Sequence, residues 1–402
     1  EALLNNKDFY KSFKNGEDLT SFFKAMHKRA VEHMLEAELD AHLDNQKHER
    51  TKEGNYRNGH GIKKIKSSFG ESEIKVPRDR DGSFEPQVIP KRSRDVSGIE
   101  DKVLAMYARG MSQRDIASTI DDIYGFTLSA EKISDITDRV LDELSEWQNR
   151  RLKKMYAFLF VDCMYATIRR DYEVKECAVY TILGYDLNGK KDILGLWLND
   201  TESKNSWMQI FDEIKKRGVE DILFISMDGV SGLTEGAKAI FPDVVVQRCI
   251  VHLIRNSIKY VPSKDYKPFT MHLKKVYGAP SLKASQAEFE KFKQAWSMYP
   301  GAVEVWNRNF EYVEQLFDYG SAIRKIMYTT NAIESVHSSF RKVTKQGAFP
   351  NENALLKLLY LRITELYSRW KNSGVQNWAL VRNQLAVNIK LQNRIVKHEN
   401  LG

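Results

Sequence analysis

Cysteine is scarce in this 402-residue chain, and long apolar runs are missing. The three cysteines, Cys163, Cys177 and Cys249, are odd in number and lack the spacing of a disulfide framework, which favours a reducing compartment. No apolar run approaches the roughly 20 residues of a membrane span, and the N-terminus has no signal-peptide pattern. We therefore expect a soluble, intracellular protein that does not contact a membrane.

Basic residues are in modest excess and unevenly distributed. Lys and Arg exceed Asp and Glu by 62 − 54 = 8, which is a weak indication of a nucleic-acid partner. Residues 46–95 hold 13 of these bases against 8 acids, so one eighth of the chain carries most of the net charge. A solvated loop region explains this equally well. If the segment instead meets phosphates, the candidate contacts are Arg57, Lys63, Lys64, Lys66, Arg78 and Arg80.

The N-terminal part of the chain is predicted to contain a helix, a basic module and a helical unit. Apolar residues at helical spacing predict an amphipathic helix over 18–45, which needs a partner in this chain or in a second copy. We assign 1–45 to dimerisation or DNA binding. Residues 46–97, with Gly, Pro, charge and short strand signals, indicate a basic β-rich or linker module.

Residues 98–152 resemble a helix-turn-helix. Helices are predicted over 99–109, 112–122 and 130–147, and Ser112 with Asp115 forms a capping-box pattern. Helical hairpins without DNA contacts are common, but the adjacent basic segment favours DNA binding. The third helix would then present Lys132, Ser134, Asp135 and Arg139 to a groove.

The middle of the chain predicts an α/β sheet. Three β-rich runs precede a helix, a strand, a short helix and another strand; the predicted strands cover 156–168, 176–185, 192–198, 222–226 and 244–246. This order is typical of a ribonuclease H-like fold, and a Rossmann unit is disfavoured because no Gly-rich turn follows the first strand. We assign 153–258 and 326–372 to the two parts of this core, 259–325 to an all-helical insertion, and 373–402 to a C-terminal tail.

Two aspartates stand out in the predicted strands. Asp162 interrupts an apolar strand, where an ionised acid is costly without a compensating cation. Asp228 follows a buried strand directly, at the end where α/β folds present ligands. A strand-end salt bridge and an ordinary turn aspartate are the plain alternatives for these two positions.

A third acid, Glu334, begins a predicted helix. Its sequence context also suits simple helix capping, in which the carboxylate bonds back to the cap. Helical geometry nevertheless aligns Glu334 with two cations, Arg341 and Lys345, opposite an apolar face. Together, Asp162, Asp228 and Glu334 suit two Mg²⁺ or Mn²⁺ ions, which would support phosphodiester hydrolysis and strand transfer.

At this point the sequence resembles a known family. The run from Asp228 to His252, the segment Tyr328 to Ser335 and the pair Arg341-Lys342 are similar to transposases of bacterial insertion sequences of the Mutator superfamily. The resemblance implies that Asp162, Asp228 and Glu334 are the catalytic metal ligands of a ribonuclease H-like domain. It also implies binding to terminal inverted repeats and a replicative route through a circular DNA intermediate. The family often has Asn where this chain has His337.

Cys249 and His252 form a Cys-x-x-His pair without a matching second pair, which disfavours structural zinc. The resemblance marks the pair as a family signature beside the active site, and a packing or DNA-positioning role is expected for it and for Arg248. Trp296 and Trp306 are candidates for stacking on unpaired bases, although a core role is the stronger interpretation.

The sequence therefore predicts a cytoplasmic, nucleoid-associated DNA transposase that cuts element ends and joins the freed 3′-hydroxyl to target DNA. Two ends must be handled together, so a homodimer is expected, and no small-molecule substrate is. Two alternatives stay open: a catalytically silent helix-turn-helix DNA-binding protein, and a structure-selective DNA nuclease or resolvase.

Overall fold

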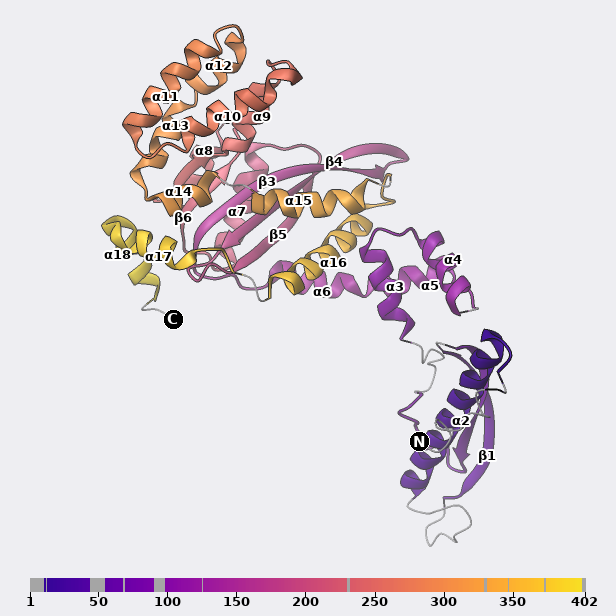
Figure 1. Cartoon of the computed structure of the whole chain (residues 1–402). Helices are drawn as coiled ribbons and strands as arrows, with labels where there is room; N and C mark the ends of the chain where they lie inside the picture. Colours follow the sequence, from indigo (N-terminus) through magenta and orange to yellow (C-terminus); the bar gives the residue numbers. More distant parts are fainter. Residues whose placement is uncertain are drawn as a thin grey trace. The chain divides into compact units, whose positions relative to one another are not determined.

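The computed structural model describes residues 11, 13–43, 55–67, 69–89, 98–124, 126–229, 232–328, 331–345, 347–371 and 374–399. The chain divides into two compact units, Glu1–Arg139 and Val140–Gly402, and each is described by itself. Their elements can be followed in Figure 1. Within the described ranges, no helix has both the length and the apolar character needed to span a bilayer.

The first unit opens with a long helix packed on a hairpin. Helix α2 (Gly16–Leu43) contacts the antiparallel pair β1 (Arg57–Ser67) and β2 (Gly70–Asp79). Leu35 of α2 and Ile65 of β1 are fully buried in the small hydrophobic core between them. The helix predicted over 18–45 is confirmed, with residues 44 and 45 outside the described ranges, and its partner lies in the same chain.

Three short helices complete this unit: α3 (Ile99–Ala108), α4 (Gln113–Tyr124) and α5 (Ala130–Asp138). Ser112 caps α4 as predicted, because the Asp115 amide donates to Ser112 Oγ at 3.2 Å. The Asp115 carboxylate accepts the Ser112 hydroxyl at 2.8 Å and not the Ser112 amide, so the capping box is formed only in part.

The helix predicted over 130–147 is present, but it is divided at Arg139. The first part, α5, ends at Asp138, and the second, α6 (Val140–Asn149), belongs to the second unit. Near the break, the Thr137 hydroxyl donates to the Ser134 carbonyl at 3.0 Å. Such side-chain bonds to the preceding turn weaken and bend helices, a local effect that apolar periodicity does not reveal.

A five-stranded mixed sheet organises the second unit. Its strands are β3 (Met155–Arg170), β4 (Glu173–Tyr185), β5 (Lys191–Asn199), β6 (Asp221–Met227) and β7 (Val245–Arg248). Their order is β5-β4-β3-β6-β7, in which β3, β4 and β5 pair antiparallel while β6 and β7 run parallel to β3. The five predicted strands and the mixed α/β class are confirmed.

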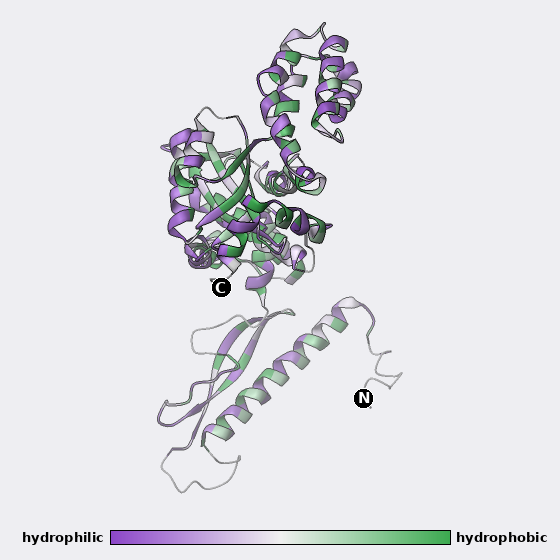
Figure 2. Cartoon of the chain, turned by 90° about the vertical axis from the view of Figure 1, so that its left-hand side faces the viewer, coloured by the Kyte–Doolittle hydropathy of each residue, from purple (hydrophilic) through white to green (hydrophobic). Residues whose placement is uncertain are grey.

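Helices cover both faces of the sheet because its strands are apolar almost throughout. Helices α7 (Lys204–Lys216) and α8 (Leu233–Ile240) share one hydrophobic core with β3, β4 and β6. Helix α15 (Asn331–Thr344) contacts β3 and β4, and α16 (Glu352–Trp370) contacts β5. In Figure 2 hydrophobic and hydrophilic residues alternate along the helices of this unit.

The segment between β7 and α15 is helical, as predicted. Its α-helices are α9 (Ile250–Ile258), α10 (Tyr266–Tyr277), α11 (Leu282–Ala295), α12 (Pro300–Asn307), α13 (Phe310–Gln315) and α14 (Ser321–Tyr328). Trp306 is fully buried and donates to Ser257 Oγ at 3.0 Å. Trp296 is half-buried and donates to His272 Nδ1 at 3.1 Å. Both side chains thus have packing roles inside this helical segment.

The predicted C-terminal tail forms two further helices, α17 (Trp378–Val387) and α18 (Ile389–Glu399). Trp378 meets the rings of Phe158 and Tyr185 edge-on, with centroids 6.1 and 6.5 Å away. Arg394 of α18 donates to Asp221 at the start of β6, with Nε 2.9 Å from Oδ2. The end of the chain therefore packs on the sheet.

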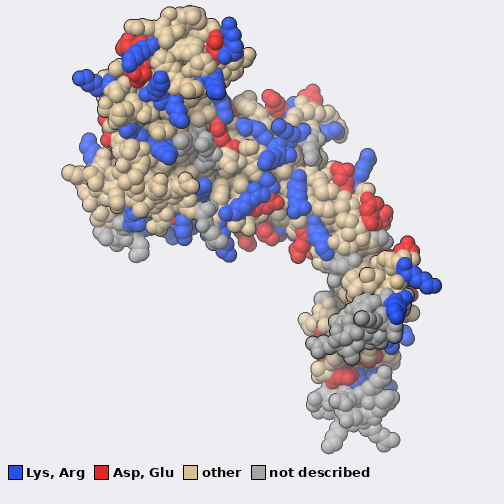
Figure 3. Space-filling view, viewed as in Figure 1, with Lys and Arg blue, Asp and Glu red and all other residues tan. Residues whose placement is uncertain are grey.

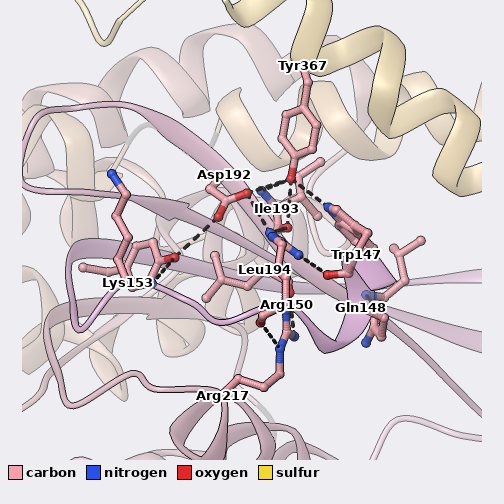
Figure 4. A network of polar contacts seen from close by, with 11 residues as sticks. Trp147, Gln148, Arg150, Lys153, Asp192, Ile193, Leu194, Arg217 and Tyr367 are labelled. Atoms are coloured by element: carbon pink, nitrogen blue, oxygen red, sulfur yellow. Dashed lines mark hydrogen bonds and ion pairs between the residues drawn. The ribbon is translucent and has the colours of Figure 1, made fainter. Parts of the chain in front are cut away.

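A polar network fixes the β5 edge of the sheet (Figure 4). Tyr367 of α16 donates to Asp192 Oδ1 at 2.7 Å and accepts from the Ile193 amide at 3.1 Å. Arg150 donates to the same Asp192 oxygen at 2.8 Å, and Trp147 of α6 points its indole N–H at the Tyr367 hydroxyl, 3.4 Å away. Two helices and one strand are joined through a single carboxylate.

Candidate active site

The strand register places Asp162 and Asp228 level with each other. Every residue of β3 that pairs with β6 has its partner 66 positions later; the last such pair is Phe160 with Ser226. The two aspartates have the same offset, 228 − 162 = 66, and lie two positions beyond this pair. Adjacent parallel strands are about 4.8 Å apart, so both acids belong to one edge of the sheet.

Asp162 is largely buried between two histidines. Its Oδ2 lies 3.0 Å from Nδ1 of His337, and its Oδ1 lies 3.8 Å from Nε2 of His252 and accepts the Cys163 amide at 2.9 Å. Burial by itself raises the pKa of Asp162, but the two histidines and the Cys163 amide outweigh it and hold that pKa below its usual range. This acid is therefore ionised at neutral pH.

Asp228 follows the last residue of β6, and its Oδ1 accepts the Gly229 amide at 2.6 Å. No ion pair joins it to another residue of the described ranges. Its negative charge acts on two neighbours, His252 and Glu202. The acid at the end of β6 thus forms no ion pair with a described residue, although its charge acts on His252.

Helix α9 carries the Cys-x-x-His pair to the same edge. The Cys249 amide donates to the Met227 carbonyl at 2.8 Å, which fixes the start of α9 beside the end of β6. Burial lowers the pKa of His252, but interaction with Cys249 and the nearby carboxylates of Asp228 and Asp162 outweighs this and raises it to about 9. His252 therefore acts as a cation beside the two aspartates.

Arg248 packs against the residue that follows Asp228. Its guanidinium lies so close to Gly229 that a methyl group at that glycine would overlap it. It also lies over the ring of Tyr312, 5.8 Å from the centroid. A larger residue after Asp228 would therefore displace the Arg248 side chain.

Glu334 reaches the site from the first turn of α15. It lines a small cavity together with Asp162, Ser226, Cys249 and His252. Its carboxylate is ion-paired with Arg255, which lies on α9 one turn after His252. The fold therefore brings all three predicted acids to one region, with Asp162 and Glu334 facing the same cavity.

The acids are chemically suited to a hard divalent cation. Carboxylate oxygens are the ligands that Mg²⁺ and Mn²⁺ prefer, and Asp162 and Asp228 provide negative charge beside His252. Among the described residues, however, no three His, Cys, Asp or Glu side chains are arranged closely enough to hold a metal ion. The third carboxylate, that of Glu334, is instead ion-paired with Arg255.

The predicted DNA-contacting residues fall into two groups. Several are paired with acids of their own unit: Arg57 with Asp40, Lys64 with Glu73, Lys66 with Glu71 and Arg139 with Glu100. Lys63 is half-buried on β1. The remaining side chains are exposed and form no ion pair with another described residue: Arg78, Arg80, Lys132, Arg341 and Lys345.

Arg341 and Lys345 continue the helix that carries Glu334. On the face of the molecule in Figure 3, Lys and Arg side chains gather over the region of α15 and α16. Lys342 adds a third exposed cation to the same end of α15. A positively charged surface therefore lies in the same unit as the acids.

Three residues near the site were not predicted from the sequence: Glu202, Arg255 and His337. Glu202 lies between β5 and α7, and Trp207 Nε1 donates to its carboxylate at 2.9 Å. Burial, followed by the charges of Asp228 and Asp162, raises its pKa. Glu202 and Arg255 have no sequence signal, and His337 was marked only as a departure from the Asn often found there in the family. Each is brought to the site by strands and helices that meet only in the fold.

Comparison with known proteins places the chain in a family. The model of the family "Transposase, Mutator family" matches residues 2–373. A probable transposase for an ISRM3-like insertion sequence element from Sinorhizobium fredii is 39% identical over 390 residues, with 96% of each chain covered. The transposase for insertion sequence element ISRM3 from Rhizobium meliloti is 38% identical over 392 residues, again with 96% of each chain covered.

One solved structure, the Drosophila P element transposase strand transfer complex, aligns with a TM-score of 0.28 and 11% identity. It covers 68% of this chain and 79% of its own, and a likeness this weak carries no argument about fold or function. The family match and the two relatives are independent of it. This chain belongs to the Mutator family of transposases.

Proposed function

We propose that this protein is the transposase of a bacterial insertion sequence. It binds the terminal inverted repeats of its element, cleaves the DNA at the element ends and joins the 3′-hydroxyl to target DNA, by a replicative, circle-forming route in the nucleoid. Family membership supports the general activity. The observation that carries the chemistry is the common offset of 66 between β3 and β6, which makes Asp162 and Asp228 level neighbours.

Asp162, Asp228 and Glu334 are the proposed holders of two Mg²⁺ or Mn²⁺ ions. When bound, such a pair activates a water or a 3′-hydroxyl and stabilises the leaving oxygen of an in-line displacement. The protein supplies carboxylates in fixed positions. The buried His337 ring lies against Asp162, and Glu334 lines the same cavity as Asp162. The strand order β5-β4-β3-β6-β7 supports a ribonuclease H-like core for this site.

Arg255 has a proposed part in assembling the site. It holds Glu334 by an ion pair and is itself half exposed. A DNA phosphate offers Arg255 another anionic partner, and this exchange would free the Glu334 carboxylate for the cation. His252 provides positive charge beside Asp162 and Asp228 until the acids are otherwise neutralised.

The central test is end cleavage by three single variants. Asp162→Ala, Asp228→Ala and Glu334→Ala are each expected to abolish cleavage and strand transfer on inverted-repeat DNA while binding to that DNA persists. Nicking assays with Mg²⁺ and gel-shift measurements on the same preparations provide the two readouts. Full activity in any one variant would remove that residue from the ligand set.

The same assay separates the alternatives. A catalytically silent binding protein would shift inverted-repeat DNA without nicking it at any Mg²⁺ concentration. A structure-selective nuclease or resolvase would cut branched junctions as well as cognate ends and would form no joined product.

We also propose that the protein acts as a homodimer, because two element ends are handled together. Helix α2 leaves Leu19, Met26 and Met34 exposed on the surface that the hairpin does not cover. Replacing Met26 and Met34 with Glu is expected to shift the mass measured by light scattering from dimer to monomer, since charged residues oppose burial of this surface. Replacing exposed Lys24 with Glu is the control, and an unchanged mass in the double variant would exclude α2 from the interface.

A further inference from the structure

His337 is the buried partner of Asp162. It lies on α15, three residues after Glu334, and its side chain is 1% exposed. Residues three apart on a helix share a face. Helix α15 therefore directs two side chains to the site: Glu334 lines the cavity, and His337 approaches Asp162 from the protein interior.

The Asp162 carboxylate lies beside a ring nitrogen of His337 that lacks a hydrogen bond. Nδ1 lies 3.0 Å from Asp162 Oδ2, and neither ring nitrogen has a hydrogen-bond partner among the described residues. A buried polar group without a partner is costly, so the ring is stabilised by a carboxylate within hydrogen-bonding distance.

This contact orients the carboxylate as a whole. With Oδ2 against His337, the other oxygen, Oδ1, accepts the Cys163 amide and points toward His252 at the cavity. Phe340, one turn further along α15, is fully buried and keeps the helix against the sheet. The imidazole is thus supported by rigid elements, as an orienting group requires.

We propose that His337 is a positioning residue that fixes Asp162 in the orientation needed to hold a divalent cation. This inference rests on the proposed function, because it assigns Asp162 to the metal site. The alternative is a histidine that only fills the core between α15 and β3. The two roles differ in what a donor at position 337 does for metal binding.

The test compares two substitutions of equal shape. His337→Gln keeps an N–H donor, and His337→Met has nearly the same length without one. Mn²⁺ binding to the full-length protein without DNA is measured by isothermal titration calorimetry, and the Mg²⁺ concentration for half-maximal end cleavage by a nicking assay. H337M is expected to weaken Mn²⁺ binding about 10- to 100-fold and to raise the half-maximal Mg²⁺ concentration in parallel. H337Q is expected to stay within about threefold of the original protein, as a retained donor should.

Equal Mn²⁺ affinity in H337M and the original protein would overturn the proposal, as would equal losses in H337M and H337Q. Circular dichroism and inverted-repeat binding check the fold of each variant, and His337→Leu replaces H337M if that variant is unfolded. If both donor-free variants unfold while H337Q binds Mn²⁺ normally, His337 is a folding residue and the proposal fails.

Asp228→Asn separates this inference from the proposed function. If D228N binds Mn²⁺ as tightly as the original protein, the proposed metal site itself is wrong. If D228N loses binding and H337M does not, the metal site stands and only the role of His337 is refuted.

Discussion

The acids at two edges of the same sheet differ in how many hydrogen-bond donors surround them. At the β5 edge, the Asp192 carboxylate is met by Arg150, by the Tyr367 hydroxyl and, at 3.4 Å, by the Tyr156 hydroxyl. At the end of β3 and β6, Asp228 forms no ion pair with another described residue. Asp162 accepts the Cys163 amide and lies near two histidines, His337 and His252, but receives no Arg, Lys or hydroxyl hydrogen bond from the described residues. A saturated network stabilises a fold, whereas an unsatisfied one is a sign of a ligand site.

Asp192 and Asp162 are both partly buried carboxylates on a strand, and in the sequence only Asp162 stands inside an apolar run. In the fold they differ in how many hydrogen-bond donors their neighbours offer. Substitutions at the two edges should therefore have different consequences, one on activity and the other on stability.

The largest effect is expected from Asp228→Asn. Loss of one anionic oxygen ligand should remove several kcal/mol of transition-state stabilisation, which is a decrease of about 10³-fold or more in end cleavage. Thermal stability should be unchanged or higher, because the like charges of Asp162 and Glu202 are nearby. Single-turnover cleavage measures the loss of activity, and a thermal melt measures the stability. A destabilised D228N would show that Asp228, like Asp192, has a structural role.

Asp192→Asn should do the reverse. The variant weakens the charged hydrogen bonds from Arg150 and Tyr367, so we expect a loss of about 2–3 kcal/mol in unfolding free energy. Cleavage per folded molecule should be retained. Urea denaturation measures the loss; a variant as stable as the original would show that the network is dispensable.

Tyr367→Phe removes only the hydroxyl that joins α16 to β5. A cost of about 1–2 kcal/mol is expected, because the Ile193 amide loses its acceptor and Asp192 a donor. Tyr360→Phe, a buried tyrosine on the same helix, is the matched control and should cost less. Equal losses in the two variants would assign the effect to packing instead of the network.

The smallest effect concerns Glu202, whose pKa is raised by burial and by Asp228 and Asp162. An acid with a raised folded-state pKa loses stability as the pH rises above its unfolded value, about 4.3, and through the folded value. Glu202→Gln should therefore be more stable than the original by about 2–4 °C at neutral pH, with the difference vanishing near pH 4.

Thermal melts across this pH range test the prediction for Glu202. Glu213→Gln is the control, since Glu213 also accepts an indole N–H, from Trp197 at 2.7 Å, and its side chain is 42% exposed. A gain that is independent of pH, or one shared by the control, would contradict the electrostatic explanation.

The sequence predicted the strands of the sheet well because apolar runs mark them. The strand β6 and the second half of β4 are mostly apolar runs, and the turn between β4 and β5 has Gly189 at φ +73°, which glycine adopts easily. The break at Arg139 was missed, since it depends on a side-chain bond from Thr137 and not on periodicity. The helices of the C-terminal segment were missed for a related reason. Trp378 packs against Phe158 of β3, a contact that exists only once the sheet has formed.

By itself, the sequence determined the strand pattern, the family and the three acidic candidates, because apolar periodicity and motif spacing are local properties of the chain. Only the tertiary structure decided that Asp162 and Asp228 stand level, that His337 and Glu202 join them, and that Arg255 holds Glu334. Those relations join residues up to 175 positions apart, since 337 − 162 = 175. They depend on the register of neighbouring strands and on which helix face meets the sheet, and neither is encoded within any single segment.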